Sequence, residues 1–473
     1  KRGTILQGCR VLGASADLPR LAAELNANLV IITIANVVPA TLRKIVKLAE
    51  DAGLPVQIIP GLHDILSGKV NISKVRAVAI EDLLGRAQVH LEEDAIAEFI
   101  TGRCVLITGA GGSIGSEIVR QVVRYAPGRL VLVDQAENVL FHLLRHLKED
   151  GYAAEPRIAN VSDAERMEQV ISEISPDVIF HAAAHKHVPL MEENPGEAIR
   201  NNVLGTRTVA ELAHRHGVDA FVMVSTDKAV NPTSVMGASK RVAEIFVQAL
   251  AATSKTRFIT VRFGNVLGSE GSVVPIFKEQ IARGGPVTVT HPEMIRYFMT
   301  IPEASQLVLQ AATMGDGGEI FILEMGEPIK IANLARDLIR LSGYRPDEDI
   351  EIAFSGMRPG EKLYEEINLS EENANKTKHP RIWIGRHEPR PLADVTAMID
   401  ELVSMARKVT KVELLRALKR IIPEFTPEDL GEAPAGMKTA AGETSEASEE
   451  PERADGPSPV AAAMPAQSSS ASS

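Results

Sequence analysis

Short apolar runs alternate with helix-length segments from about Gly102 onward. The apolar runs are "CVLIT" (104–108), "LVLVD" (130–134), "VIFHA" (178–182), "FVMVS" (221–225) and "FITVR" (258–262). Because β-rich runs separated by helices are the signature of a doubly wound parallel sheet, this pattern predicts an α/β, Rossmann-type fold.

The helical segment after "FVMVS" carries a single apolar stripe. Val242, Ile245, Phe246 and Ala249 are spaced i, i+3, i+4 and i+7, so they share one face of a helix. We expect that face to pack on the sheet, with Lys240 at the front of the helix.

The N-terminal region has its own, smaller α/β pattern. "LVIITI" predicts a strand, and "PATLRKIVKLAEDAG" predicts a helix that ends at Gly53. The unit resembles the second half of a nucleotide-binding fold, but it lacks a glycine fingerprint, so we assign it no ligand. We delimit it as residues 1–95, followed by a Rossmann core at 96–263.

The C-terminal half divides into two regions. Residues 264–430 are irregular at first and then helical at "IANLARDLIRLSG" and "VTAMIDELVSMARKV". We expect this region to cover the carboxyl edge of the sheet and to hold the substrate. Residues 431–473 have no aromatic residue and are dominated by Ala, Ser, Glu and Pro, so we expect a disordered tail.

Charge and hydropathy narrow the class of protein. The 473 residues carry 62 acidic and 51 basic side chains, a formal net charge of -11, which argues against nucleic acid as a partner. No apolar run reaches the roughly 18 residues of a membrane span, so the chain as given is expected to be soluble. It begins "KRGTILQG", without an initiator Met, and we expect its natural start to lie upstream.

A glycine-rich turn between a strand and a helix predicts a dinucleotide site. In "CVLITGAGGSIGSEIVRQ", glycines permit a tight turn, and the helix N-terminus attracts a pyrophosphate. Asp134 ends the next strand, where it can accept hydrogen bonds from a ribose 2′-OH and so favours NAD over NADP; the alternative is that it caps the following helix. The expected cofactor residues are Gly109, Gly112, Ser113, Ile114, Gly115, Asp134, Gln135, Asn160, Val161, Ala182, Ala183 and Lys240.

Several long motifs resemble the extended short-chain dehydrogenase/reductase proteins that act on nucleotide sugars. They are "TGAGGSIGSE", "AAAHKHVPLMEENP", "NNVLGT", "STDKAVNPTSVMGASKR", "RFGNVLGSEGSV" and "GMRPGEKLYEE", and the resemblance runs from about residue 5 to 425. Within that family, the chain is most similar to the membrane-anchored, configuration-retaining UDP-N-acetylglucosamine 4,6-dehydratases. The resemblance implies NAD as cofactor, a UDP-sugar as substrate, a homo-oligomer, and a full-length protein anchored upstream on the cytoplasmic face of the inner membrane.

The usual proton-transferring pair of these enzymes is incomplete. Short-chain dehydrogenases pair Tyr with a Lys one helical turn later, but Met236 precedes Lys240 here and a thioether cannot take a proton. The replacements stand at the end of "FVMVS". The resemblance implies that Thr226 binds the C4 oxygen, Asp227 protonates the departing C6 oxygen, Lys228 or a partner it activates takes the C5 proton, and Lys240 holds the nicotinamide ribose.

The same resemblance suggests the substrate contacts. The expected residues are Lys186, Asn265, Arg296, Arg358 and Glu361. A guanidinium group suits a diphosphate, although each arginine could instead form an ordinary surface ion pair. The three histidines of "HAAAHKHVP" lack carboxylate or thiolate companions, so we predict no metal site.

Together these features predict a lyase that converts UDP-N-acetylglucosamine to a UDP-4-keto-6-deoxy sugar, with retention at C5, for surface-glycan synthesis. A C4 epimerase is the alternative within the same fold, but it would need only a hydride shuttle at C4. A catalytically silent sensor or scaffold that binds NAD and a nucleotide sugar is the alternative from another class, suggested by the missing Tyr.

Overall fold

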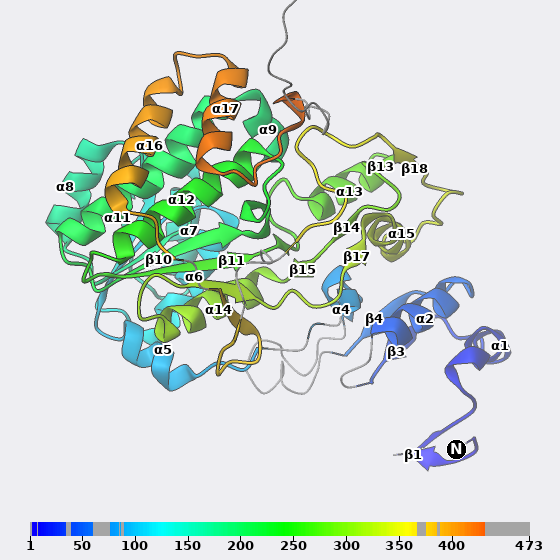
Figure 1. The fold of residues 1–473 in the computed structure, drawn as a ribbon. Coiled ribbons are helices and arrows are strands. Elements are labelled where there is room, and N and C mark those ends of the chain that lie inside the picture. Colours follow the sequence, from blue (N-terminus) through cyan, green and yellow to red (C-terminus); the bar gives the residue numbers. More distant parts are fainter. Residues whose placement is uncertain are drawn as a thin grey trace, which may run out of the picture. The chain divides into compact units, whose positions relative to one another are not determined.

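The computed structural model describes residues 2–6, 8–34, 39–59, 76–84, 86, 89–366, 375–385 and 388–430. The predicted tail at 431–473 lies outside these residues. Lys1–Gly431 forms one compact unit of the chain, and the helices and strands below belong to it (Figure 1).

A nine-stranded sheet organises this unit, in the order β19-β20-β16-β11-β10-β9-β6-β7-β8. The strands from β8 to β16 are parallel, whereas β20 runs antiparallel to β16 and to β19. Their bounds are β6 Cys104–Thr108, β7 Arg129–Asp134, β8 Glu155–Ile158, β9 Val178–His181, β10 Ala220–Thr226, β11 Arg257–Phe263, β16 Ile320–Leu323, β19 Asn375–Lys376 and β20 Ile382–Gly385. The predicted doubly wound parallel sheet is confirmed, and the five apolar runs supply β6, β7, β9, β10 and β11.

Helices cover both faces of the sheet. Successive residues of a strand point to opposite faces, and the central strands are apolar on both, so both faces must be shielded from water. One apolar cluster joins the sheet to α8 Ala164–Ile174, α11 Gly205–Arg215, α12 Val235–Ala251, α16 Leu392–Met405 and α17 Lys411–Ile421. The opposite cluster joins it to α5 Glu93–Ile100, α6 Ser113–Val122, α7 Glu137–Glu149 and α14 Ile301–Met314. In Figure 1, α16 and α17 lie above α12, and α5 and α14 lie below the sheet.

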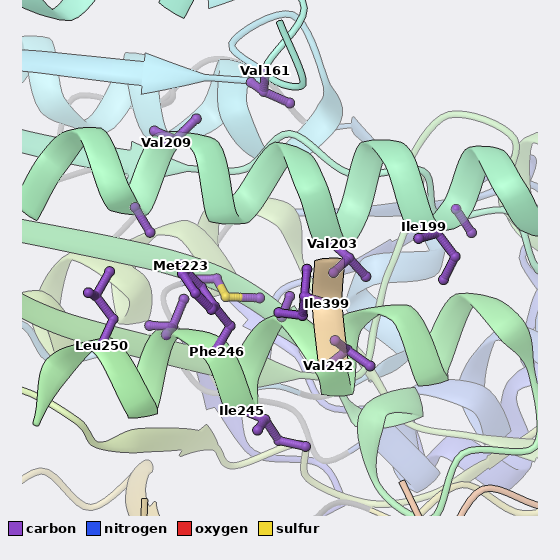
Figure 2. Close-up of a cluster of buried hydrophobic side chains, with 14 of the residues drawn as sticks. Val161, Ile199, Val203, Val209, Met223, Val242, Ile245, Phe246, Leu250 and Ile399 are labelled. Carbon is purple, nitrogen blue, oxygen red and sulfur yellow. The ribbon is translucent and has the colours of Figure 1, made fainter. Parts of the chain in front are cut away.

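The stripe predicted on the helix after "FVMVS" is buried on α12. Figure 2 shows Val242 and Phe246 in one apolar cluster with Met223 of β10 and Ile399 of α16. The predicted packing of this helix is therefore confirmed, and α12 is held between the sheet and an outer helix.

The N-terminal part contains the predicted strand and helix. β3 Val30–Ile32 pairs parallel with β4 Val56–Ile58, which pairs antiparallel with β5 Arg76–Ala77. The predicted helix is α2 Pro39–Glu50, and Gly53 follows it with φ +70°. The other elements here are β1 Ile5–Leu6, β2 Cys9–Arg10, α1 Leu18–Glu24 and α4 Ile80–Leu84.

Residues after 263 extend the main sheet and also build smaller strand pairs. The sheet gains β16, β20 and β19 from this region. The pairs are β12 Asn265–Val266 with β15 Phe298–Met299, β13 Val287–Val289 with β18 Ile352–Phe354, and β14 Ile295–Arg296 with β17 Ile329–Lys330. Two predicted helices are confirmed, as α15 Ile331–Leu341 and α16, and α13 Val273–Ala282 packs against α15.

Two short α-helices, α9 Val188–Glu193 and α10 Pro195–Ala198, precede a π-helical segment, Ile199–Leu204, that runs into α11. Within the described ranges, no helix has the length and apolar character needed to cross a bilayer.

Candidate active site

The candidate site lies at the carboxyl edge of the central strands. Since β6, β7, β9 and β10 are parallel neighbours, the segments that follow them meet at one edge of the sheet. Those segments contain the glycine turn, Asp134, the "HAAAH" stretch and Thr226 with Asp227 and Lys228. This edge therefore brings the predicted cofactor residues and the predicted catalytic residues into neighbouring places.

The glycine turn allows β6 and α6 to pack closely. Gly109 has φ +66°, and a Cβ placed on it would lie 2.6 Å from the backbone nitrogen of Ala183. A Cβ on Gly115 would lie 2.0 Å from the carbonyl oxygen of Gly109. Side chains at these two positions would force the turn apart, so the glycines are required by the backbone itself.

The start of α6 faces the same edge. Gly112 is the N-cap residue, and Ser113 opens the helix, so the first N–H groups of α6 are free of helical partners. Ser113 Oγ accepts a hydrogen bond of 3.2 Å from the backbone N–H of Glu270. Ile114 packs on the apolar cluster around α6. An anion would find backbone donors here.

A cavity of about 140 Å³ opens beside this turn. The residues that line it are Gly109, Gly112, Val133, Asp134, Gln135, Ala159, Asn160, Val161, Ala182, Ala183, Ala184, His185 and Asn201. Eight of the twelve expected cofactor residues are among them. The cavity, together with the glycine turn in which an added Cβ would clash, fits the adenosine half of a dinucleotide.

Asp134 connects the two loops at the cavity edge. Its carboxylate accepts hydrogen bonds of 3.0 Å from the backbone N–H of Gly111 and of Ala136. Ala136 is the N-cap residue of α7, so Asp134 supports the start of that helix and also lines the cavity. Beside it, Asn160 donates a hydrogen bond of 3.0 Å to the side-chain oxygen of Gln135.

A polar cluster follows the end of β10. Asp227 is 1% exposed, and its Oδ1 accepts a hydrogen bond of 2.9 Å from Thr226 Oγ1. Lys228 Nζ donates to three oxygens: Asp227 Oδ1 at 3.1 Å, Asn265 Oδ1 at 2.9 Å and Glu365 Oε1 at 2.8 Å. Three acceptors require three N–H groups, so Lys228 is an ammonium. Burial lowers its pKa, but the two carboxylates outweigh burial and raise it.

Glu365 is the residue of this cluster that the sequence analysis missed. It is buried, and its Oε1 lies 3.1 Å from Nε of Arg296. Burial first, and then the charge of Asp227, raise the pKa of Glu365 to about 7. It stands in "GMRPGEKLYEE", where the sequence does not show which glutamate turns inward. The expected Glu361 is half-buried, and Glu366 is exposed.

Lys240 and Met236 lie on the first turns of α12. Lys240 Nζ donates a hydrogen bond of 2.8 Å to the carbonyl oxygen of Val224 on β10, and burial lowers its pKa to about 8 against the opposing charge of Glu244. Met236 is 4% exposed within an apolar cluster, as expected for a packing residue.

The expected substrate residues separate into two groups. Asn265 and Arg296 belong to the polar cluster, and Arg296 also donates to the carbonyl oxygens of Leu363 and Lys362. Arg358 is exposed, and its backbone N–H donates to Glu361 at 3.3 Å. Lys186 is exposed, and partial desolvation of its ammonium group lowers its pKa against the charge of Glu270. Diphosphate contacts through these residues stay a prediction.

His181 of β9 is held inside the fold by hydrogen bonds to both ring nitrogens. His181 is fully buried, with Nδ1 at 2.8 Å from Thr108 Oγ1 and Nε2 at 3.0 Å from Thr206 Oγ1. Burial and the charge of Lys240 lower its pKa to about 3, so the ring is neutral. Across the described residues, no group of His, Cys, Asp and Glu side chains could hold a metal ion.

The chain is similar to proteins of polysaccharide synthesis over most of its length. It is 48% identical over 421 residues to the capsular polysaccharide biosynthesis protein CapD of Staphylococcus aureus. The matched region covers 88% of this chain and 70% of CapD. It is 47% identical over 385 residues to the probable polysaccharide biosynthesis protein EpsC of Bacillus subtilis, covering 80% of this chain. The chain spans only 64% of the length of EpsC.

A shorter relative and two solved structures share the core. An inverting UDP-N-acetylglucosamine 4,6-dehydratase of Campylobacter jejuni is 34% identical, covering 58% of this chain and 80% of its own. The structure of Pen from Bacillus thuringiensis matches with a TM-score of 0.57 and 33% identity, covering 61% of this chain and 90% of Pen.

The second structure shows the fold alone. DesIV, a dTDP-glucose 4,6-dehydratase of Streptomyces venezuelae solved with NAD and TYD bound, matches with a TM-score of 0.51 and 21% identity. The match covers 56% of this chain and 88% of DesIV. The family model described as polysaccharide biosynthesis protein matches residues 105–387, which contain the glycine turn, the polar cluster and the sheet, and the chain belongs to that family.

Proposed function

We propose that this chain is a hydro-lyase that binds NAD and converts UDP-N-acetylglucosamine to a UDP-4-keto-6-deoxy sugar, with retention at C5. The C. jejuni relative is named for this substrate and for 4,6-dehydration. The cavity beside the glycine turn fits the cofactor that this reaction needs.

The observation that carries the proposal is the buried polar cluster at the end of β10. Asp227, Lys228 and Glu365 are joined within 3.1 Å, at the edge where open α/β sheets bind ligands. A C4 epimerase needs only a hydride shuttle at C4. Elimination of water across C5 and C6 needs an acid and a base in addition, and this cluster contains carboxyl groups that can serve as both.

NAD, when bound, would supply the acceptor for the C4 hydride and the donor of the hydride to C6. The C4 hydroxyl proton is released to solvent, and a solvent proton is added at C5 when the hydride enters at C6. Thr226 hydrogen-bonds the C4 oxygen, and Lys240 holds the nicotinamide ribose. Asp227 gives a proton to the C6 oxygen, which leaves as water. Because Lys228 is an ammonium, the C5 proton goes to a carboxylate that Lys228 holds, the second of the two routes that the family resemblance allows.

Retention at C5 is proposed from the position of Met236. The C. jejuni dehydratase is named as inverting. The retaining branch that the chain resembles also has Met where other members have Tyr, and Met236 is a packing residue here. With no phenol at this position, the polar cluster is the proton-transferring group nearest to the end of β10.

The test is incubation of the protein with NAD and UDP-N-acetylglucosamine in deuterated water, followed by proton NMR. We expect a new C6 methyl signal and deuterium at C5. Borohydride reduction and sugar analysis then read the configuration at C5. A C4 epimer without a methyl signal would replace the proposal with an epimerase. Binding of both ligands without conversion would replace it with a silent sensor.

A further inference from the structure

We propose that Glu365 is a positioning residue of the elimination: its carboxyl group shares one proton with Asp227, and this shared proton lets Asp227 act as the acid. The inference rests on the proposed function, and it adds a residue and a protonation state to that site. It answers how Asp227 can hold a proton while it lies beside an ammonium group.

In each of the two carboxyl groups, one oxygen is bound by a cation and the other has no hydrogen-bond partner among the described residues. The cationic donors bind Asp227 Oδ1 and Glu365 Oε1. The remaining oxygens, Asp227 Oδ2 and Glu365 Oε2, are buried and have no hydrogen-bond partner of their own among the described residues. Lys228 Nζ lies 3.1 Å from Asp227 Oδ1 and 2.8 Å from Glu365 Oε1, so one ammonium group holds the two carboxyl groups beside each other. Two carboxyl groups held this close share one proton more readily than they both ionise.

The charges around the pair hold this arrangement in place. Lys228 and Arg296 are the cations that contact it, from the turn after β10 and from β14. The guanidinium of Arg296 also donates to the carbonyl oxygens of Lys362 and Leu363, so Arg296 is fixed to the loop that carries Glu365. On that loop, Lys362 pairs with Glu366 and donates to the carbonyl oxygen of Val230 instead.

Asp227 alone would be a poor acid in this position. Burial raises the pKa of Asp227, but Lys228 and the hydrogen bonds to the carboxylate outweigh burial and lower it. The partner carboxyl group has the raised pKa of about 7. A proton stored on the pair near neutral pH can therefore be passed to the C6 oxygen through Asp227.

The proton balance of the elimination closes within the cluster. The C5–H and C6–O bonds break and a C5=C6 double bond forms. The proton of the pair leaves with the C6 oxygen as water, and the proton from C5 enters the pair. The Asp227–Glu365 pair thus ends the step with one proton, as it began.

The test compares Glu365→Gln with Glu366→Gln. The amide introduced by E365Q can accept from Lys228 and donate to Asp227, but it cannot share a proton. We expect elimination by E365Q to fall about 100-fold near pH 6, where the wild-type pair holds its proton, with the deficit shrinking above pH 7 as the wild-type pair loses that proton. Because C4 oxidation does not need this proton, the reduced cofactor should accumulate in E365Q.

Glu366, which is exposed, is the matched control, and E366Q should retain the wild-type rate and pH profile.

Two results would overturn the inference. One is a wild-type pH profile for E365Q. The other is a loss of C4 oxidation in parallel with elimination, which would mark Glu365 as a structural counter-charge. An infrared pH titration is a second readout that does not depend on turnover: near pH 6, the wild type and E366Q should show a protonated carboxyl band that E365Q lacks. If the wild type makes no methyl-bearing product, the proposed function fails, and the infrared band alone then decides whether a proton is shared.

Discussion

At the scale of single residues, the protonation states in the site follow from counting the N–H groups of Lys228 against the carboxyl oxygens around it. Lys228 uses all three of its N–H groups, whereas Asp227 and Glu365 each keep a buried oxygen without a donor among the described residues. A lysine in this state positions and neutralises rather than taking a proton itself. The chemistry of the cluster therefore belongs to its carboxyl groups.

Removal of either partner of the Asp227–Lys228 pair should abolish dehydration. Asp227→Asn removes the acid, and Lys228→Met removes the charge that orients both carboxylates, so we expect turnover to fall at least about 100-fold in each. The NMR assay for the C6 methyl signal measures this loss, and a circular dichroism spectrum checks that the fold is kept. Unchanged activity in both variants would disprove the assigned roles.

Met236 should be replaceable by another apolar residue of similar volume. Its side chain packs in the cluster between α12 and the sheet, and it has no proton to transfer. We expect Met236→Leu to change the free energy of unfolding by less than about 1.5 kcal/mol and to leave the dehydration rate within about twofold. A large loss of rate with normal stability would instead give the thioether a part in the reaction.

At the scale of elements, the glycine turn fixes how β6 meets α6. In Gly115→Ala the new Cβ would lie 2.0 Å from the carbonyl oxygen of Gly109, so the helix must move away from the strand. We expect a lower melting temperature and weaker NAD binding, measured by thermal melting and by titration calorimetry. Gly112→Ala is the matched variant, because its Cβ would lie 3.3 Å from the same oxygen. It should melt close to the wild type; equal melting losses in both would reject the packing argument.

The central sheet could be predicted from the sequence because its strands are apolar on both faces. β6, β7, β9, β10 and β11 can be recognised as short runs rich in apolar and β-branched residues, and the stripe on α12 has a helical period. The partners that come from far along the chain could not be predicted in this way. β16 and β20 join the same sheet from beyond residue 263, since strand pairing depends on tertiary contacts that no local pattern encodes.

The candidate site shows the same limit. Asp227 and Lys228 could be found because they follow a strong strand at the functional edge of the sheet. Glu365 reaches them from a distant part of the chain, through a loop that carries three glutamates close together, Glu361, Glu365 and Glu366. Only the fold shows that Glu365 is the buried member of the three.

At the scale of the whole molecule, buried ion pairs connect parts of the chain that are far apart in sequence. Glu303 of α14 accepts from Arg86, which precedes the main sheet, and from Arg381, which precedes β20. Arg86 also donates to the carbonyl oxygen of Glu324, at the end of β16. The carboxylate of Glu303 on α14 thus binds both the segment before the main sheet, through Arg86, and the start of β20, through Arg381.

Loss of Arg86 should therefore destabilise the whole unit. The side chains of Arg86 and Glu303 are 9% and 7% exposed, and removing one partner of a buried pair leaves a charge without compensation. Because Arg381 still binds Glu303, we expect Arg86→Ala to cost about 3 kcal/mol of unfolding free energy, at the low end for such pairs. Denaturant unfolding measures this cost. Arg20→Ala is the control, since the Arg20–Glu24 pair is exposed and its loss should leave the free energy of unfolding almost unchanged. Similar small costs in both variants would mean that the Glu303 cluster does not hold these parts together.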